Sequence, residues 1–387
     1  MRFPDFDADA FLRDYWQKRP LLIRNPWNAW CNPIEPDELA GLACEPGIES
    51  RLITLADRQA NSGWQVEPGP VPEDRFEKLG TDPWTLLVQA VDHQVPAVAA
   101  LIEPFRFVPN WRIDDVMVSY ASDGGGVGPH FDHYDVFLIQ GLGRRRWRLG
   151  QMCDADTELL PHDDLRLLAH FEPTEEWILE PGDILYVPPR LSHDGAALGD
   201  DCMTYSVGFR APGRSELVAH WCEHVLESIG DDDRYEDPDL VAPANPGEIA
   251  PAALERLQAM VLEKMRDPSE FARWFGEYTS TPKYPEVDWR PEEYLGEEAL
   301  RALIARAAPL IRNPASRFAF VRQDAGPLLL FVDGECFECA GETAQLAEAL
   351  CAGDCFEIDA ALAESDEAMA LITALYDQGS IAFEDED

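Results

Sequence analysis

Short apolar runs broken by glycine and proline are the dominant pattern in residues 1–212, and this pattern is typical of β-strands. Residues 136–139 and 184–187 are apolar throughout, and residues 51–55 also have strand composition. Residues 15–25 (YWQKRPLLIRN) pass through Pro20 into a further strand. This part of the chain is therefore predicted to be mainly β-structure.

Helical spacing of apolar residues predicts short helices in the same region, over residues 9–16, 37–44 and 82–91. For the last of these, Asp82 is a suitable N-cap and Pro83 suits the first turn.

The composition changes after Ala211, and helical patterns replace the strand patterns. Helices are predicted over residues 214–229 and 248–277, on either side of an acidic, proline-bearing loop. A linker rich in Pro, Asp and Glu covers residues 281–293. The remaining residues predict a small α+β domain with helices over 297–307, 343–351 and 365–377, and strands over 317–322, 328–332 and 380–383.

The length of the chain indicates the number of domains, and its charge limits the kinds of binding partner. The 387 residues suffice for two or three domains, and 31 basic against 73 acidic residues give a net charge of −42. Such a field opposes binding to nucleic acid and to anionic membranes, and it attracts basic proteins. Adaptation to a salty cytoplasm is an alternative explanation of the charge.

The location expected from the sequence is the cytoplasm. The chain starts without the basic-then-apolar pattern of a secretory signal, and no apolar run is long enough to span a membrane. The nine cysteines are scattered rather than arranged as a disulfide framework, which suits a reducing compartment.

The stretch GGVGPHFDHYDVFLIQGLGRRRW, which ends at Trp147, carries the candidate chemistry. A glycine-rich loop leads to His130 and Asp132, which are followed by the apolar run 136–139. If His130 and Asp132 lie on a strand, their side chains point to the same face. Two histidines and one carboxylate on one face of the metal form the Fe(II) site of non-heme oxygenases. We expect the second histidine to be His193, which follows the apolar run 184–187 and Pro188-Pro189.

The spacing around these residues resembles the two metal-binding motifs of the cupin barrel. The second motif is imperfect, because Arg190 stands where a glycine is usual. A second His-x-Asp pair, His133 and Asp135, lies in the same stretch, and its side chains are expected to face the opposite side of the strand. A His-x-Asp pair also occurs by chance, so the partner motif around His193 decides in favour of His130 and Asp132.

A metal held by three protein groups keeps positions for a 2-oxo acid and dioxygen, and a dicarboxylate cosubstrate also needs a cation. Arg144, Arg145 and Arg146 follow the turn at residues 141–143 on what is expected to be the next strand. Alternation places Arg145 and Trp147 on one face and the other two arginines on the opposite face. A solvated strand edge is the alternative explanation for exposed arginines.

Several segments together resemble the bacterial ribosomal oxygenases, which are cupin-type (JmjC-like) Fe(II)- and 2-oxoglutarate-dependent protein hydroxylases. They are YWQKRPLLIRN, WRIDDVMVSY, GGGVGPHFD, YDVFLIQGLGRRRW, EPGDILYVPP and YSVGFRAP. The resemblance implies that His130, Asp132 and His193 bind iron and that Arg145 binds the far carboxylate of 2-oxoglutarate. It also implies hydroxylation of the β-carbon of an arginine in a large-subunit ribosomal protein, the bacterial protein sixteen.

A substrate arginine needs a carboxylate and an aromatic or hydroxyl group near the metal. Asp115 and Tyr134 are the candidates, Tyr134 because it shares the parity of His130 and Asp132. Thr204 and Ser206 are candidates for contact with the cosubstrate. The alternatives are hydrogen bonding of Asp115 to backbone, and an ordinary core position for each hydroxyl.

The fold class predicted from all of this is α+β. A double-stranded β-helix catalytic domain (1–212) is followed by a helical dimerisation region (213–280) and a winged-helix-like domain (281–387). The homodimer and the winged helix are implied by the resemblance. Because the last domain is acidic, we expect no nucleic-acid binding from it. It also contains four thiols at spacings compatible with a structural zinc site, or with buried small side chains: Cys336, Cys339, Cys351 and Cys355.

Three other functions are compatible with the same motifs. Related ribosomal oxygenases act on histidine, so a histidine of another ribosomal protein is an alternative target. The same iron chemistry serves demethylases. A metal-free cupin binding module with an acidic partner-recruiting region is the non-enzymatic alternative.

Overall fold

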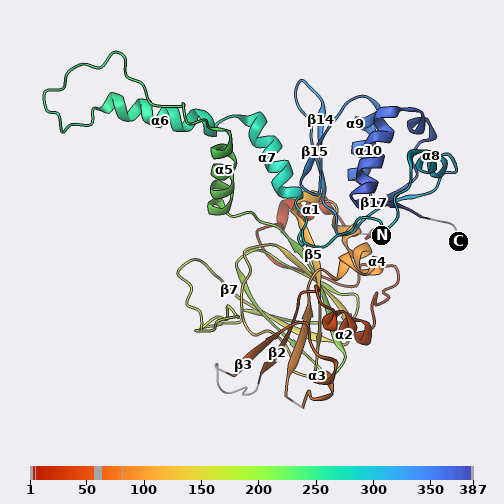
Figure 1. The fold of residues 1–387 in the computed structure, drawn as a ribbon. Coiled ribbons are helices and arrows are strands. Elements are labelled where there is room, and N and C mark those ends of the chain that lie inside the picture. The colour runs from red at the N-terminus through yellow and green to blue at the C-terminus, as the bar shows by residue number, and fades with distance from the viewer. Residues whose placement is uncertain (1–2, 5, 56–62, 81, 385–387) are drawn as a thin grey trace. The chain divides into compact units, whose positions relative to one another are not determined.

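The computed structural model describes residues 3–4, 6–55, 63–80 and 82–384 and divides into two compact units (Figure 1). The first contains Met1–Ala211 with Asn313–Ala315, and the second contains Pro212–Arg312 and Ser316–Asp387. The predicted division of the second unit at residue 280 stays a prediction.

The first unit is built on two antiparallel sheets, as the short apolar runs indicate. In the described residues the larger sheet has eight strands, in the order β1 (Leu21–Ile23), β9 (Ile184–Val187), β6 (Val136–Leu142), β11 (Cys202–Phe209), β5 (Ile113–Ala121), β4 (Trp84–Val88), β2 (Ser50–Leu55) and β3 (Trp64–Pro68). The smaller sheet has the order β10 (Leu191–Ala197), β7 (Arg145–Met152) and β8 (Glu175–Leu179).

Strand alternation directs one set of side chains from both sheets into a common cavity. On β5 the cavity is lined by Asp115, Met117 and Ser119, which are two residues apart, and also by Asp114 at the start of the strand; on β7 it is lined by Arg145 and Trp147. Alternate residues of a strand share one face, so beyond Asp114 these strands present a single face to the cavity. The cavity has a volume of about 440 Å³, which is in the range of small-molecule sites.

An aromatic cluster attaches the N-terminal segment to the larger sheet. In helix α1 (Ala8–Asp14), the carboxylate of Asp7 accepts the N–H of Ala10 as an N-cap at 2.9 Å. The fully buried Phe11 contacts Tyr186 with its ring edge at 4.9 Å between centroids. The other helices of this unit are α2 (Pro36–Cys44), α3 (Glu73–Glu77) and α4 (Pro96–Ala99), with 3₁₀ turns at Val91–His93, Ala100–Phe105 and Asn110–Arg112.

The helix predicted over residues 82–91 is wrong. The segment contains β4, which pairs with β2 on one side and β5 on the other. Residues Thr85–Val88 are buried on both faces, so the strand reads as a continuous apolar run. The Asp-Pro start signal is local, and it was overridden by pairing with strands distant in the sequence.

The second unit begins with three helices, α5 (Arg214–Ser228), α6 (Pro251–Met265) and α7 (Pro268–Ser280). The helix predicted over residues 248–277 is in fact two, because Asp267 caps a new helix with Pro268 at its first position. Trp221 of α5 and Trp274 of α7 lie together in a small buried cluster.

The rest of the second unit surrounds its own hydrophobic core, in which Leu330, Leu350 and Ile372 are completely buried. One three-stranded sheet has the order β13 (Phe318–Val321), β14 (Leu328–Val332), β15 (Glu335–Cys339), and the other has β16 (Cys355–Phe356), β12 (Leu310–Arg312), β17 (Ile381–Phe383). The helices are α8 (Glu297–Ala305), α9 (Glu342–Ala352) and α10 (Asp366–Asp377), with a 3₁₀ turn at Ala360–Glu364. In the described part of the chain, no helix is both long and apolar enough to cross a membrane.

Candidate metal centre and cavity

A two-residue β-bridge brings the candidate metal ligands together. The N–H of His130 donates to the carbonyl of His193 at 3.0 Å, and the N–H of His193 donates to that of His130 at 2.8 Å. His193 lies on β10, but His130 and Asp132 lie in the loop before β6, which begins only at Val136. The predicted strand through His130 and Asp132 is therefore wrong, although the two side chains do converge.

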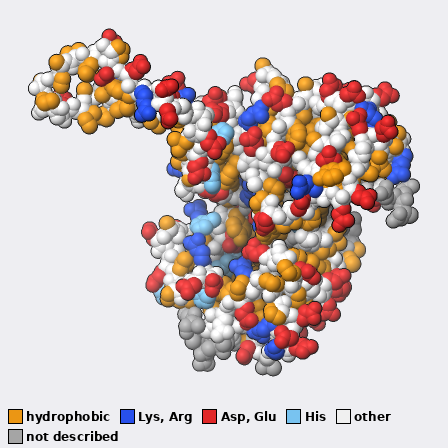
Figure 2. Space-filling view, in the orientation of Figure 1, with side chains coloured by type: hydrophobic (Ala, Val, Ile, Leu, Met, Phe, Trp, Pro, Cys, Tyr) orange, Lys and Arg blue, Asp and Glu red, His pale blue; other side chains and the backbone are white. Residues whose placement is uncertain are grey.

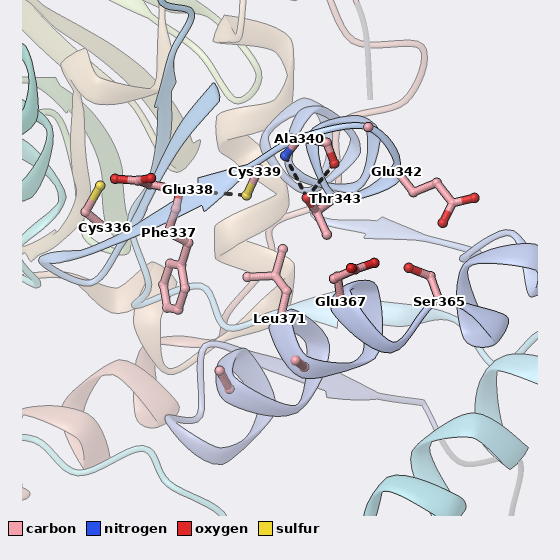
Figure 3. Close-up of a pocket in the computed structure, with 13 residues that line it drawn as sticks. Cys336, Phe337, Glu338, Cys339, Ala340, Glu342, Thr343, Ser365, Glu367 and Leu371 are labelled. Atoms are coloured by element: carbon pink, nitrogen blue, oxygen red, sulfur yellow. Dashed lines mark hydrogen bonds between the residues drawn. The ribbon is translucent and has the colours of Figure 1, made fainter. Parts of the chain in front are cut away.

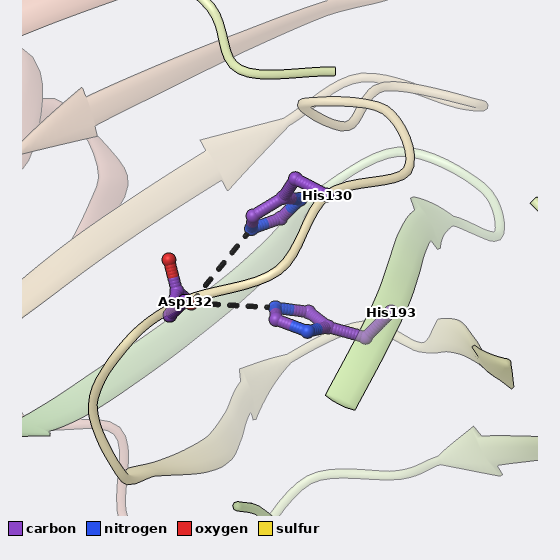
Figure 4. Close-up of side chains that lie close together, drawn as sticks. All are labelled: His130, Asp132 and His193. Atoms are coloured by element: carbon purple, nitrogen blue, oxygen red, sulfur yellow. Dashed lines mark ion pairs between the residues drawn. The ribbon is translucent and has the colours of Figure 1, made fainter. Parts of the chain in front are cut away.

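The three side chains form a compact cluster (Figure 4). One Asp132 carboxylate oxygen lies 3.6 Å from Nε2 of His193 and 4.0 Å from Nε2 of His130. One potential ligand atom from each residue lies within 4.8 Å of the others. Among the described residues this is the only such group of three or more His, Cys, Asp or Glu side chains.

Hydrogen bonds orient both imidazoles toward the centre. Nδ1 of His130 lies 2.8 Å from the carbonyl of Gly128, and Nδ1 of His193 lies 3.0 Å from that of Leu191. A carbonyl can only accept, so each Nδ1 carries a proton, and in the neutral ring Nε2 is then the nitrogen with a lone pair for a metal. Burial and the neighbouring His130 lower the pKa of His193 to about 4. A neutral imidazole at pH 7 is the form that binds metal.

Two glycines allow the bridge and the neighbouring strands to approach closely. A Cβ on Gly126 would collide with the carbonyl of Gly195, and one on Gly195 would lie 2.6 Å from the indole ring of Trp147. The glycine-rich lead-in therefore serves the packing of the ligand loop on β10.

The backbone at Arg190 explains why glycine is usual at this position. Arg190 has φ +65°, in the left-handed region, and its N–H donates to the carbonyl of Asp132 at 2.6 Å. The turn thereby fixes the loop that carries the carboxylate ligand, and an exposed arginine occupies it under strain.

Substituting Arg190→Gly should relieve this strain while preserving the hydrogen bond. We expect stabilisation of about 1 kcal/mol, roughly 2 °C in Tm, with unchanged metal affinity. Thermal unfolding of Arg190→Gly beside Arg190→Ala provides the measurement, since alanine removes the side chain but keeps the strain. An equal Tm for the two variants would contradict a backbone origin.

Arg145 is a buried cation beside the cluster. It is only 3% exposed, and its Nε and Nη2 have no hydrogen-bond partner. Its Nη1 makes one long contact, 3.5 Å, to the carbonyl of Gly195. Leaving a charge buried and unpaired costs several kcal/mol, so this position fits an anionic ligand. As predicted, Arg145 and Trp147 face the cavity. Arg144 is exposed, but Arg146 is half-buried and its Nε is buried without a hydrogen-bond partner, so the solvated edge expected for two of the arginines describes Arg144 only.

The two candidate substrate residues both line the cavity. The Asp115 carboxylate accepts the backbone N–H of Ala90 and a side-chain amide hydrogen of Gln89, both at 2.9 Å. The hydrogen bond to backbone, which was the alternative explanation for Asp115, is therefore present as well. Tyr134 is 43% exposed as a whole. Its hydroxyl group is nevertheless buried near carboxylates. Burial, and to a smaller extent the negative charge of Asp132, raises the pKa of the Tyr134 hydroxyl.

Thr204 and Ser206 lie side by side on β11 and line the cavity as well. The Thr204 hydroxyl donates to Gln140 Oε1 at 3.4 Å. Ser119, which lies opposite Thr204 on β5, was not identified from the sequence. Ser119 could have been identified because it lies an even number of residues from Asp115 on the same strand and therefore shares its face. Trp147 was placed on the face of Arg145, but the structure adds that its indole N–H is buried without a hydrogen-bond partner. For the loop residues 164–167, which also line the cavity, the sequence carries no signal.

The second His-x-Asp pair has a different environment. Asp135 is completely buried and accepts hydrogen bonds from Tyr186 Oη at 2.6 Å and Gln17 Nε2 at 2.9 Å. Burial raises its pKa, while these two donors and Arg112 oppose the rise. Asp135 therefore joins the N-terminal segment to the barrel, and His133 is exposed.

The four cysteines of the second unit do not form a metal cluster among the described residues. Cys336 and Cys339 lie three residues apart on β15, Cys351 is buried in the core and Cys355 is exposed. Burial raises the pKa of Cys351 to about 12, as expected of an inert core thiol. The zinc interpretation is thus not supported.

Comparison with known proteins agrees with this geometry. A JmjC domain model matches residues 100–217, and a ROXA-like winged helix model matches residues 263–382. The chain is 44% identical, over 299 residues, to the ribosomal protein uL16 3-hydroxylase of Escherichia coli, covering 76% of this chain and 77% of that protein. The chain belongs to the JmjC-type ribosomal oxygenases.

Solved structures of this ribosomal oxygenase family share the complete fold. The X-ray structure of E. coli YcfD matches with a TM-score of 0.89 at 36% identity, covering 99% of this chain and 100% of that chain. A structure of YcfD in complex with cobalt and 2-oxoglutarate matches with a TM-score of 0.85, also at 36% identity, covering 98% and 99%. The predicted family, the JmjC barrel and the winged-helix domain are confirmed.

Proposed function

We propose that this chain is an Fe(II)- and 2-oxoglutarate-dependent dioxygenase that hydroxylates the β-carbon of an arginine in the large-subunit ribosomal protein uL16. The observation that carries the proposal is the cluster of His130, Asp132 and His193 beside the unpaired, buried guanidinium of Arg145, in one cavity. A relative with that printed activity and a similar structure holding cobalt and 2-oxoglutarate support it. An enzyme that modifies a ribosomal protein is expected in the cytoplasm.

The residue types fit the groups they are proposed to hold. Two neutral imidazoles and one carboxylate form the donor set that holds Fe(II) and leaves coordination positions open. Iron, 2-oxoglutarate and dioxygen supply the oxidising chemistry that converts C–H to C–OH. Arg145 pairs with the far carboxylate of the cosubstrate, and the hydroxyls of Thr204 and Ser206 contact it.

Asp115 and Tyr134 are proposed to bind the substrate arginine. A carboxylate attracts the guanidinium by charge-assisted hydrogen bonds, and the phenol ring provides a face for it. Asp114 lines the same cavity and adds negative charge. The cavity wall near these residues therefore favours a cationic side chain.

Substitution of Asp115→Asn should reduce turnover of an arginine peptide about 10- to 100-fold, because a charged hydrogen bond in a cavity is replaced by a neutral one. Peptide-independent consumption of 2-oxoglutarate should be retained within about twofold, because Asp115 has no role in metal binding. Measuring both rates on one preparation, with Tm as the folding control, tests this. Equal loss of both rates would rule out the substrate role.

We further propose that the helical region forms a homodimer. α6 has no buried residue, and Leu254, Leu257 and Val261 form an exposed apolar row at helical spacing. On α5, Leu226 is 67% exposed. Figure 2 shows hydrophobic side chains at the surface of this segment, at the upper left. Contiguous exposed apolar surface of this kind marks an interaction site.

The double substitution Leu254→Glu/Val261→Glu should convert a dimer to a monomer, because it places charges in the apolar row. Light scattering after size exclusion gives the mass directly. Ala252→Glu/Ala259→Glu adds the same charge at exposed positions on the opposite face of α6 and should leave the dimer intact. A monomeric wild-type protein would refute the dimer.

The target residue is tested by mass spectrometry of ribosomal proteins incubated with enzyme, Fe(II) and 2-oxoglutarate. One added oxygen on an uL16 arginine is the expected product. Oxygen on a histidine of another ribosomal protein would favour the histidine hydroxylase alternative, and loss of methyl groups would favour a demethylase.

A further inference from the structure

A groove in the second unit is formed between β15 and α10, and it contains none of the residues assigned to the metal centre or its cavity. It has a volume of about 780 Å³ and is lined by residues 336–343, by Ser365 and by the α10 residues Glu367, Ala370, Leu371 and Ala374 (Figure 3). The floor is apolar, because Phe337 from β15 and Leu371 from α10 both line the groove (Figure 3).

The groove runs along the edge of β15 rather than across its face. Side chains of a strand alternate between two faces, so a cavity on one face is lined by every second residue. Here four consecutive residues, Cys336–Cys339, line the groove. In the described residues β15 pairs only with β14, so its other edge has no strand partner there. The carbonyl of Phe337 accepts a long contact, 3.7 Å, from the thiol of Cys339. An extended segment can add to such an edge as a further strand.

The rim of the groove is negatively charged. Glu338, Glu342 and Glu367 line it, and no Lys, Arg or His is among the described lining residues. Glu338 makes an ion pair with Arg273 on α7, whereas Glu342 and Glu367 are exposed carboxylates at the starts of α9 and α10. The groove therefore combines main-chain hydrogen-bonding groups, an apolar floor and a rim that favours cations.

The negative charge of the chain and of the groove rim determines which kind of molecule can bind in the groove. A second copy of this chain carries a net charge of −42 and is repelled, and the same field opposes a nucleic acid. Ribosomal proteins are rich in Lys and Arg because they bind RNA phosphates. Their exposed segments supply both the positive charge and the extended backbone.

We propose that this groove binds an extended, Lys- or Arg-bearing segment of the ribosomal protein substrate by strand addition to β15. The inference rests on the proposed function, since it assigns a second binding site for the same substrate. The groove contributes to affinity for the whole ribosomal protein, while the metal cavity alone binds a short peptide around the target residue.

The test compares two substrates, purified full-length uL16 and a short peptide containing the target arginine. In the full-length enzyme, Glu342→Lys/Glu367→Lys should raise KM for uL16 about 5- to 20-fold, because two attractive charges become repulsive. kcat/KM for the peptide should stay within about twofold, and the uL16 effect should shrink in high salt. Glu298→Lys/Glu357→Lys makes the same charge change outside the groove and should behave as wild type.

A steric variant gives an independent measurement. Ala370→Trp places an indole from an exposed position of α10 into the groove, and Ala352→Trp is the matched change on α9 outside it. Only Ala370→Trp should weaken uL16 binding. Unchanged KM for uL16 in both groove variants, or equal effects in the two lysine double variants, would overturn the proposal. If the wild-type enzyme hydroxylates neither substrate, the proposed function fails instead.

Discussion

Replacing His130 by alanine is expected to abolish metal binding and reduce 2-oxoglutarate turnover by about 10³-fold or more, because a three-ligand site loses one ligand. The two remaining ligands, Asp132 and His193, cannot restore the donor set on one face of the metal. The measurement is the affinity for Co(II) from its absorption spectrum, together with turnover at saturating Fe(II).

The neighbouring His-x-Asp pair provides the control. His133 is exposed and lies three residues from His130 in the same loop, so His133→Ala should retain metal affinity and turnover. If His133→Ala lost metal as completely as His130→Ala, the assignment of the first pair would be wrong. Retention of metal by His130→Ala would contradict the cluster itself.

Replacing Arg145 by alanine should weaken 2-oxoglutarate binding by about 10²- to 5 × 10³-fold, because a buried ion pair that loses one partner costs about 3–5 kcal/mol. Arg145→Lys should restore only part of the affinity, since an ammonium cannot make two parallel hydrogen bonds to a carboxylate. The affinity is measured by calorimetry with Mn(II) and 2-oxoglutarate without substrate, and KM for 2-oxoglutarate gives the kinetic counterpart.

The adjacent Arg144 is exposed in the turn immediately before β7 and is the matched control. Arg144→Ala should leave 2-oxoglutarate binding unchanged. Equal losses in the two variants would indicate a general effect of positive charge rather than a defined carboxylate site. Succinate also has two carboxylates, so its affinity should decrease in the same order, from the wild type to Arg145→Lys to Arg145→Ala.

The substitutions His130→Ala and Arg145→Ala also distinguish an enzyme from a non-catalytic binding protein. A cupin that only binds a partner has no need for a buried, unpaired guanidinium next to two imidazoles with free Nε2 atoms. The cost of burying Arg145 without a partner is offset only when an anion occupies the cavity. Iron-dependent consumption of 2-oxoglutarate by the wild type, and its loss in both variants, is the combined expected result.

Strand addition at β15 would extend recognition beyond the cavity. Short-peptide and whole-protein substrates would then depend on different parts of the chain. The acidity of the winged-helix domain has a specific use in this scheme, at the groove rim.

Local features of the sequence determined much of the architecture. The apolar runs 136–139 and 184–187 are strands because both faces are buried. Arg145 and Trp147 share one face of β7 because they are two residues apart on that strand. The candidate ligands could be named because their residue types and spacing match one coordination chemistry.

Only the tertiary structure decided how these residues meet. His130 and Asp132 do not lie on a strand, and it is the bridge to His193 that brings the ligands together. Residues 84–88 are a strand because β2 and β5 pair with them, against their own helix-start signal. The unpaired state of Arg145, the buried role of Asp135 and the free edge of β15 all depend on contacts between segments far apart in the chain. Periodicity and spacing act within a few residues, whereas pairing and burial are properties of the whole fold.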